Sequence, residues 1–245
     1  MKKILLFLCL ILTLTGCVRY DVDVYFPHVN SGMMIQHIKL GEQLTSFSKG
    51  EGDILLKNIE TQAKKLEGKT KRISKEELVV TIPFDNGKDL VTKFNQFFVA
   101  PDTDKTRKKL AQNDYNTLFD LNAKMSIEQK NLLLLERNTL NLNADLTPLG
   151  VIANDGTIII SSGDLIDLQI QFSFPFGAKL ITNDYPKWEK LANNNYKISL
   201  EAGQINEIKA IFWLPNYVGL GTVLIAVFIL SGYYLKYRKF PLISR

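Results

Sequence analysis

The stretch LTLTGCVRYDVDVYF, from Leu12 to Phe26, joins an apolar run to a strictly alternating segment, with a cysteine between them. From Val18 to Phe26 every second residue is apolar, while charged residues such as Arg19 and Asp21 lie between them. This period of two is typical of a strand with one buried face. We therefore expect a sheet to begin almost directly after Cys17.

The segment before this strand is typical of an export signal. Two lysines precede thirteen uncharged residues, Ile4–Gly16, which are too few to cross a bilayer, since a crossing takes about 20 residues. We expect residues 1–16 to be a signal peptide. The residues Leu14–Cys17 resemble the lipobox of bacterial lipoproteins, in which the cysteine is diacylated. The resemblance implies lipidation at Cys17, and an ordinary signal peptide with a cysteine nearby is the alternative.

The far end of the chain carries a second membrane signal. Nineteen residues from Tyr217 to Leu235 have no charge, which is enough to span a bilayer at about 1.5 Å of rise per residue. We expect a transmembrane helix over 216–235, with a buried core helix as the alternative. The tail, 236–245, is basic with no acid, so the positive-inside rule predicts a cytoplasmic C-terminus. Residues 17–215 then form one domain on the periplasmic or luminal side of a plasma or thylakoid membrane.

The formal net charge of +5 does not indicate a nucleic-acid-binding protein. Six of the 30 basic residues lie in the signal segment or the tail, so the domain keeps 24 of them against all 25 acidic residues. The positive excess is therefore a property of the membrane-flanking ends. We expect no nucleic-acid partner.

The domain combines strand-like and helix-like periods. Met34, Ile38 and Leu40 share one face of a second strand, which we expect to pair with the first. Apolar residues at helical spacing predict helices over 51–69 and 87–99. We expect further strands at 76–84, 131–150, 164–177 and 195–215, and a loop or a short surface helix over 101–130. The predicted fold class is α+β: mostly antiparallel sheet with two or so packed helices, plus one C-terminal transmembrane helix.

One side of the second predicted helix is a candidate ligand-cavity face. Its residues are Leu90, Phe94, Phe97 and Phe98. Such a face could hold a lipid or a pigment, and ordinary core packing is the alternative.

A group of basic residues at the end of the first helix is a candidate contact for anionic lipid headgroups. Its members are Lys64, Lys65, Lys69, Lys71, Arg72 and Lys75. A basic residue near a charged membrane surface contributes about 1 kcal/mol. The alternative is a solvated helix end whose cations interact with the helix dipole.

The chain offers little material for catalysis. Its two histidines are His28 and His37, and it has no metal-ligand spacing, phosphate loop, dinucleotide fingerprint or nucleophile motif. We therefore expect no enzymatic activity, no cofactor and no metal. Carboxylates such as Asp164 and Asp167 leave an envelope hydrolase with a carboxylate-based site as an alternative.

Several phrases of the chain resemble one family. They are GCVRYDVDVYF (16–26), QHIKLGEQLTSFS (36–48), LVVTIPF (78–84), FNQFF (94–98) and LEAGQINEIKAIFWLP (200–215), followed by a single apolar helix. As a set they resemble the cyanobacterial and plastid branch, of unknown function, of the LppM-like lipoproteins. The resemblance implies an α+β domain with helices packed on a mostly antiparallel sheet. It also implies a cell-envelope location and a likeness to lipid-binding folds, but no residue roles.

Anchors at both ends favour a function at the membrane surface. We expect a non-catalytic, membrane-anchored lipoprotein that serves as a binding module or as an assembly or scaffolding factor for membrane-protein complexes. The alternative within the same class is a lipid- or pigment-binding or transfer domain. The expected partners are membrane lipids and a membrane-protein complex.

Overall fold

The computed structural model describes most of the chain. The described residues are 18–26, 31–41, 49–98, 122–147, 166–182 and 186–237.

The larger of two sheets has seven strands in the order β3-β4-β2-β1-β7-β10-β9. Their bounds are β1 (Val18–Tyr25), β2 (Gly32–Leu40), β3 (Lys69–Arg72), β4 (Glu77–Phe84), β7 (Ile166–Ser173), β9 (Lys187–Lys190) and β10 (Asn195–Leu200). Neighbouring strands are antiparallel except β1 and β7, which are parallel. The alternating segment that follows Cys17 is thus a central strand, with every second side chain buried.

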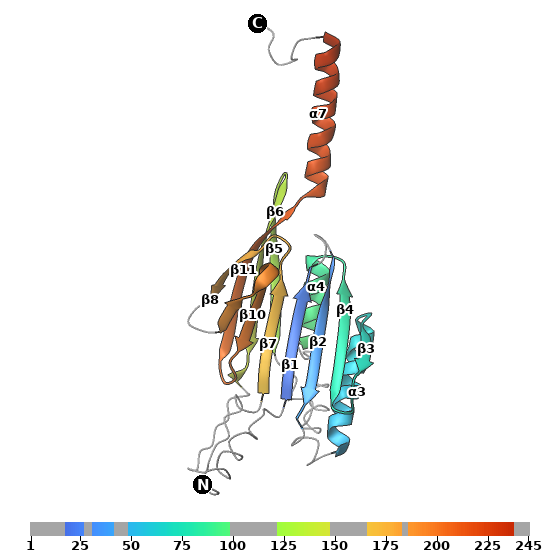
Figure 1. Cartoon of the computed structure of the whole chain (residues 1–245), viewed down its shortest axis with the longest axis vertical. Helices are drawn as coiled ribbons and strands as arrows, with labels where there is room; N and C mark the ends of the chain where they lie inside the picture. Colours follow the sequence, from blue (N-terminus) through green and yellow to red (C-terminus); the bar gives the residue numbers. More distant parts are fainter. Residues whose placement is uncertain are drawn as a thin grey trace, which may run out of the picture.

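The smaller sheet has four antiparallel strands in the order β5-β6-β11-β8. Their bounds are β5 (Ala123–Leu132), β6 (Leu135–Asp145), β8 (Ala178–Thr182) and β11 (Ile205–Pro215). The helices are α3 (Lys49–Lys65), α4 (Gly87–Phe98) and α7 (Tyr217–Tyr237), with a short 3-10 turn at Ala192–Asn194. Figure 1 shows α3 and α4 against the β4 side of the large sheet, while α7 projects away from the strands.

An aromatic cluster joins the two sheets near the root of α7. The rings of Phe174 and Phe212 are 4.5 Å apart, and Phe26 lies 5.9 Å from Phe212 and 5.1 Å from Phe84. These residues come from the ends of β1, β4 and β7 and from β11. Aromatic burial of this kind makes a large contribution to core stability.

Helix α4 is joined to the small sheet through one side chain. Asn95 Oδ1 accepts a hydrogen bond of 2.7 Å from the backbone N–H of Met125, and Asn95 Nδ2 donates one of 2.9 Å to the Met125 carbonyl oxygen. Met125 lies on β5, the edge strand of its sheet. Asn95 therefore pairs the backbone groups of Met125 as a neighbouring strand would. It covers part of the β5 edge of the small sheet.

The predicted α+β class is confirmed, including the antiparallel pairing of the first two strands, where Val18 lies opposite Leu40. The loop or short helix predicted as far as residue 130 is wrong over Ala123–Lys130, which belong to β5. Beyond Ile127 the strand is exposed on both faces, so alternation, the usual signal of a strand, is missing there. Strands β3, β8 and β9 were not predicted, because each has only four or five residues.

Candidate functional site

The small sheet continues into α7 through a single residue. Strand β11 ends at Pro215 and α7 begins at Tyr217. Between them, Asn216 caps the helix, because its Oδ1 accepts hydrogen bonds from the backbone N–H groups of Val218, at 3.1 Å, and Gly219, at 3.2 Å. The backbone N–H of Asn216 also donates to the Leu134 carbonyl oxygen, at 2.9 Å. The helix is therefore fixed in direction relative to the small sheet.

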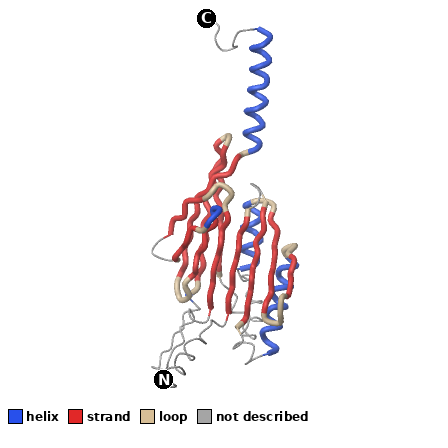
Figure 2. The backbone as a smooth tube through the Cα atoms, viewed as in Figure 1, coloured by secondary structure: helices blue, strands red, loops and turns tan. Residues whose placement is uncertain are grey.

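Helix α7 is long and apolar enough to cross a membrane, judged by length and composition. It has 21 residues, and only 6% of its most apolar window is buried by the rest of the chain. A core helix would be largely covered, so the alternative of a buried core helix does not describe α7. Figure 2 shows it as a single helix extending beyond all the strands.

The outer face of the small sheet carries a hollow of about 420 Å³. It is lined by Lys124, Ser126, Asn141, Leu142, Asn143, Ile181, Glu207, Ile208 and Lys209. The strand register builds it, because Ser126, Asn141, Lys209 and Ile181 follow one another across all four strands. Lys124, Asn143 and Glu207 form the adjacent row.

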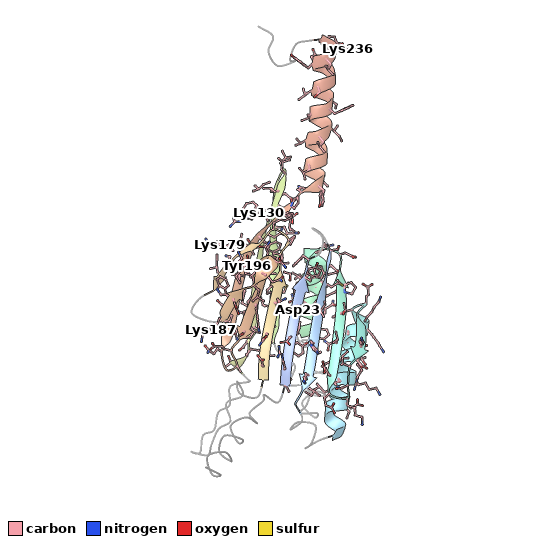
Figure 3. All side chains as sticks on the ribbon, viewed as in Figure 1. Asp23, Lys130, Lys179, Lys187, Tyr196 and Lys236 are labelled. Carbon is pink, nitrogen blue, oxygen red and sulfur yellow. The ribbon has the colours of Figure 1, made fainter. Side chains whose placement is uncertain are left out.

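The hollow combines apolar side chains with charges of both signs. Lys124 and Lys209 supply ammonium groups, and Glu207 supplies a carboxylate that accepts a hydrogen bond of 3.2 Å from Asn143 Nδ2. Lys179 lies in the next row, opposite Ile211, and is labelled over the small sheet in Figure 3. Such a surface offers donors and acceptors to an extended polar partner. Within the described part of the chain, no group of three or more His, Cys, Asp or Glu residues could hold a metal ion.

The phenylalanine face of α4 lies in the core. Leu90, Phe94, Phe97 and Phe98 are all buried. The ring of Phe98 lies 4.5 Å from that of Phe94 and 6.1 Å from that of Tyr20 on β1. The space that Phe94 and Phe98 line with the large sheet has a volume of only about 10 Å³, which is about the size of one water molecule.

A hydrogen bond between Tyr20 and Gln36 lies inside the core beside this face. Tyr20 is buried, and its hydroxyl donates a hydrogen bond of 2.5 Å to Gln36 Oε1. Burial raises the pKa of the Tyr20 hydroxyl well above its ordinary value. Tyr20 therefore stays neutral and acts as a hydrogen-bond donor.

The predicted basic group lies along the end of α3, strand β3 and the turn after it. Its lysines, Lys64, Lys65, Lys69, Lys71 and Lys75, are exposed. Arg72 differs from them, because its Nε donates to Glu60 Oε1 at 2.6 Å and its Nη1 donates to Asp53 Oδ1 at 2.7 Å. In Figure 1 strand β3 lies at an edge of the large sheet, away from the root of α7.

Asp23, on the outer face of the large sheet, has a perturbed pKa. Burial and the neighbouring Asp21 raise the pKa of Asp23 above its ordinary value, while His37 opposes the shift. His37 Nε2 lies 2.6 Å from Glu77 Oε1. Asp23 is labelled on this face in Figure 3. His28, Asp164 and the predicted lipidation residue Cys17 lie outside the described residues.

The two predicted anchors connect to opposite ends of the domain. Strand β1 ends beside Phe26, which contacts Phe212 near the root of α7. Val18, at the other end of β1, lies eight residues away, or about 26 Å at the rise of a strand. A lipid on the residue preceding Val18 would therefore be attached to the end of the large sheet away from α7.

Sequence patterns did not single out the hollow. Its polar residues alternate with buried ones on β6 and β11, as on any sheet with one solvated face. Only the register of the four strands brings them together, since Lys124 and Lys209 are 85 residues apart in the sequence. Local sequence patterns also do not predict the hydrogen bond from the backbone N–H of Asn216 to the Leu134 carbonyl oxygen.

Comparison with known proteins gives a family but no activity. A search of curated proteins finds no significant match. Among solved structures, the NMR structure of the folded domain of LppM from Mycobacterium tuberculosis is similar, with 15% sequence identity and a TM-score of 0.42, over 82% of this chain and 92% of that one. The cyanobacterial and plastid branch stays a prediction. The family model described as "Protein of unknown function (DUF3153)" matches residues 25–241, and the chain belongs to this family.

Proposed function

We propose that the protein is a membrane-anchored, non-catalytic binding module that presents the outer face of its small sheet to a protein partner at the membrane surface. The observation that carries this proposal is the continuity of β11 with α7. Lys209 in the hollow and Tyr217 in the helix lie on one run of chain, interrupted only by Asn216. A partner bound in the hollow would be held at a fixed height above the membrane.

The chemistry of the hollow favours a protein over a lipid tail. Amide, ammonium and carboxylate groups line it together with apolar side chains such as Ile181 and Ile208. This mixture suits a protein surface, which offers both kinds of group, better than a hydrocarbon chain. The alternative of an enclosed lipid or pigment has less support, because the space beside Phe94 and Phe98 holds about 10 Å³.

Photo-crosslinking in native membranes tests this proposal. A benzoylphenylalanine at Asn141, inside the hollow, is expected to give one discrete protein adduct. The same probe at Ser199, an exposed position on the large sheet, is the matched control and is expected to give none. Lys209→Glu, which reverses one charge of the hollow, should remove the adduct while leaving the chain folded. An adduct of lipid mass at Asn141, or equal adducts at both positions, would contradict the proposal.

A further inference from the structure

The β5–β6 hairpin extends beyond the sandwich and ends in four consecutive leucines. We call Leu132, Leu133, Leu134 and Leu135 the leucine tip. Their side chains are exposed by 55%, 62%, 40% and 46%. Figure 1 shows the hairpin projecting beside the root of α7. The rest of the described chain leaves these side chains about half exposed, and exposed apolar groups of this kind mark contacts with something outside the chain.

The turn itself does not require leucine. Leu133 and Leu134 are the two residues between the strands, and Leu133 has φ of 46°. Two-residue hairpin turns favour Asn-Gly and similar pairs, because these residues adopt positive φ readily. A leucine in this conformation is uncommon. Its presence therefore points to a role for the side chain that the turn geometry does not explain.

The backbone of the leucine tip lies directly against the first turn of α7. Besides the hydrogen bond from Asn216 to Leu134, the carbonyl oxygen of Leu133 lies where a Cβ on Gly219 would be. The 21 residues of α7 rise by about 31 Å, which matches a hydrocarbon core of about 30 Å. The first turn of α7, and with it the leucine tip, then lies at the boundary of that core.

Side chains typical of the headgroup layer lie one step behind the tip. Lys130 pairs with Arg137, which pairs with Trp213. The Arg137 guanidinium lies 6.0 Å from the centre of the Trp213 ring. Figure 3 labels Lys130 on the hairpin near α7. This row lies two residues, or about 7 Å, from Leu132, and tryptophan and basic side chains are enriched at that depth.

We propose that the leucine tip inserts into the lipid leaflet beside α7, with Lys130 and Arg137 at the level of anionic headgroups. The inference rests on the proposed membrane anchoring by α7. Beyond the apolar tip come the row of tryptophan and cations and then the charged side chains of the hollow. This order matches the change of polarity across one side of a bilayer. The hairpin is thus a second membrane contact, which fixes the rotation and tilt of the small sheet.

Site-specific fluorescence on the full chain tests this inference. Cys9 and Cys17 are replaced by serine, and an environment-sensitive dye is attached at Leu133→Cys in vesicles of phosphatidylcholine and phosphatidylglycerol. We expect a blue-shifted emission and quenching by lipids that carry a doxyl group close to the headgroup. The quenching should be about twofold stronger than at Glu128→Cys, farther back on β5. A dye at Phe228→Cys, in the middle of α7, reports whether the helix is inserted.

The outcomes separate the two proposals. If Phe228→Cys is in lipid and Leu133→Cys is in water, the leucine tip does not insert and only this inference fails. If Phe228→Cys is also in water, the membrane anchoring itself fails. A blue shift at Leu133→Cys without lipid quenching would mean that a second copy covers the tip, which also overturns the inference.

A redesigned turn gives a variant that we expect to fold. Leu133→Asn combined with Leu134→Gly supplies the residues that a two-residue turn prefers. We expect the hairpin to form and a dye at Leu132→Cys in this background to lose its lipid quenching. Retention of full quenching would contradict a role for the leucine side chains.

Discussion

The phenylalanine face of α4 and the leucine tip are both clusters of large apolar side chains, but the first is buried and the second is exposed. The four residues of the phenylalanine face are exposed by 8% or less, whereas those of the leucine tip are exposed by 40% or more. The first group finds its partners inside the chain, on β1 and neighbouring strands. The described residues cover the second group only in part. Apolar residues that are left outside a well-filled core are the better guide to an external contact.

Removing an aromatic ring from the core should give the largest change in the free energy of unfolding. Phe94→Ala should lower the free energy of unfolding by about 3–5 kcal/mol, because it leaves a cavity beside Phe98 and Tyr20. Urea unfolding of the full chain in detergent measures this change. The depth of the leucine tip in vesicles should not change. A loss below about 1 kcal/mol would instead favour a face that lines a ligand cavity.

The link between α4 and the small sheet should give the next largest effect. Asn95→Ala removes both hydrogen bonds to Met125 and leaves two backbone groups of β5 unpaired, at a cost of about 2 kcal/mol. Asn141→Ala, on the exposed face of the same sheet, is the control and should change the free energy of unfolding by less than about 0.5 kcal/mol. Equal losses for the two variants would mean that Asn95 does not close the edge of β5.

The sequence predicted the parts of this fold that local periodicity encodes. The alternation around Tyr20 predicted a half-buried strand, the helical spacing around Phe94 predicted a packed helix, and the charge-free run predicted α7. Cross-strand relations were not predictable. Leu133 and Leu134 could be taken for the start of a strand, since nothing local shows that the hairpin passes beyond the sandwich. The hollow requires four strands in register, and no single segment encodes it.

Two glycines of α7 give a matched test of the contact between hairpin and helix. Gly219→Ala should cost about 1–3 kcal/mol, because its Cβ would overlap the Leu133 carbonyl oxygen. Gly221 has no atom within 4 Å of such a Cβ, so Gly221→Ala should be neutral or slightly stabilising. Thermal unfolding and hydrogen exchange of the Asn216 amide measure the difference. Faster exchange in both variants would contradict a specific contact at Gly219.

A smaller effect is expected from Asp23 on the outer face of the large sheet. The pKa of Asp23 is raised above its ordinary value of 3.8, so the folded state binds the proton more tightly than the unfolded state does. Stability should therefore fall as the pH rises from 3.8 through the folded-state pKa. Asp23→Asn should remove this decline and raise the stability at pH 7. If Asp23→Asn also abolished the crosslink at Asn141, the large sheet would take part in partner binding.

The orientation of the domain on the membrane tests the central claim most directly. Energy transfer to acceptor-labelled headgroups is measured in vesicles from a donor on an encoded unnatural residue at Asn131, beside the leucine tip. A second donor is placed at Ser199, which lies in register with Gln169 and Asp21 near the Val18 end of the large sheet. Cys17 is replaced by serine, so that a lipid cannot draw the Val18 end to the membrane. We predict strong transfer from Asn131 and little from Ser199, because the domain stands on the leucine tip and α7. Equal transfer from both sites would contradict the claim and mean that the domain lies along the membrane.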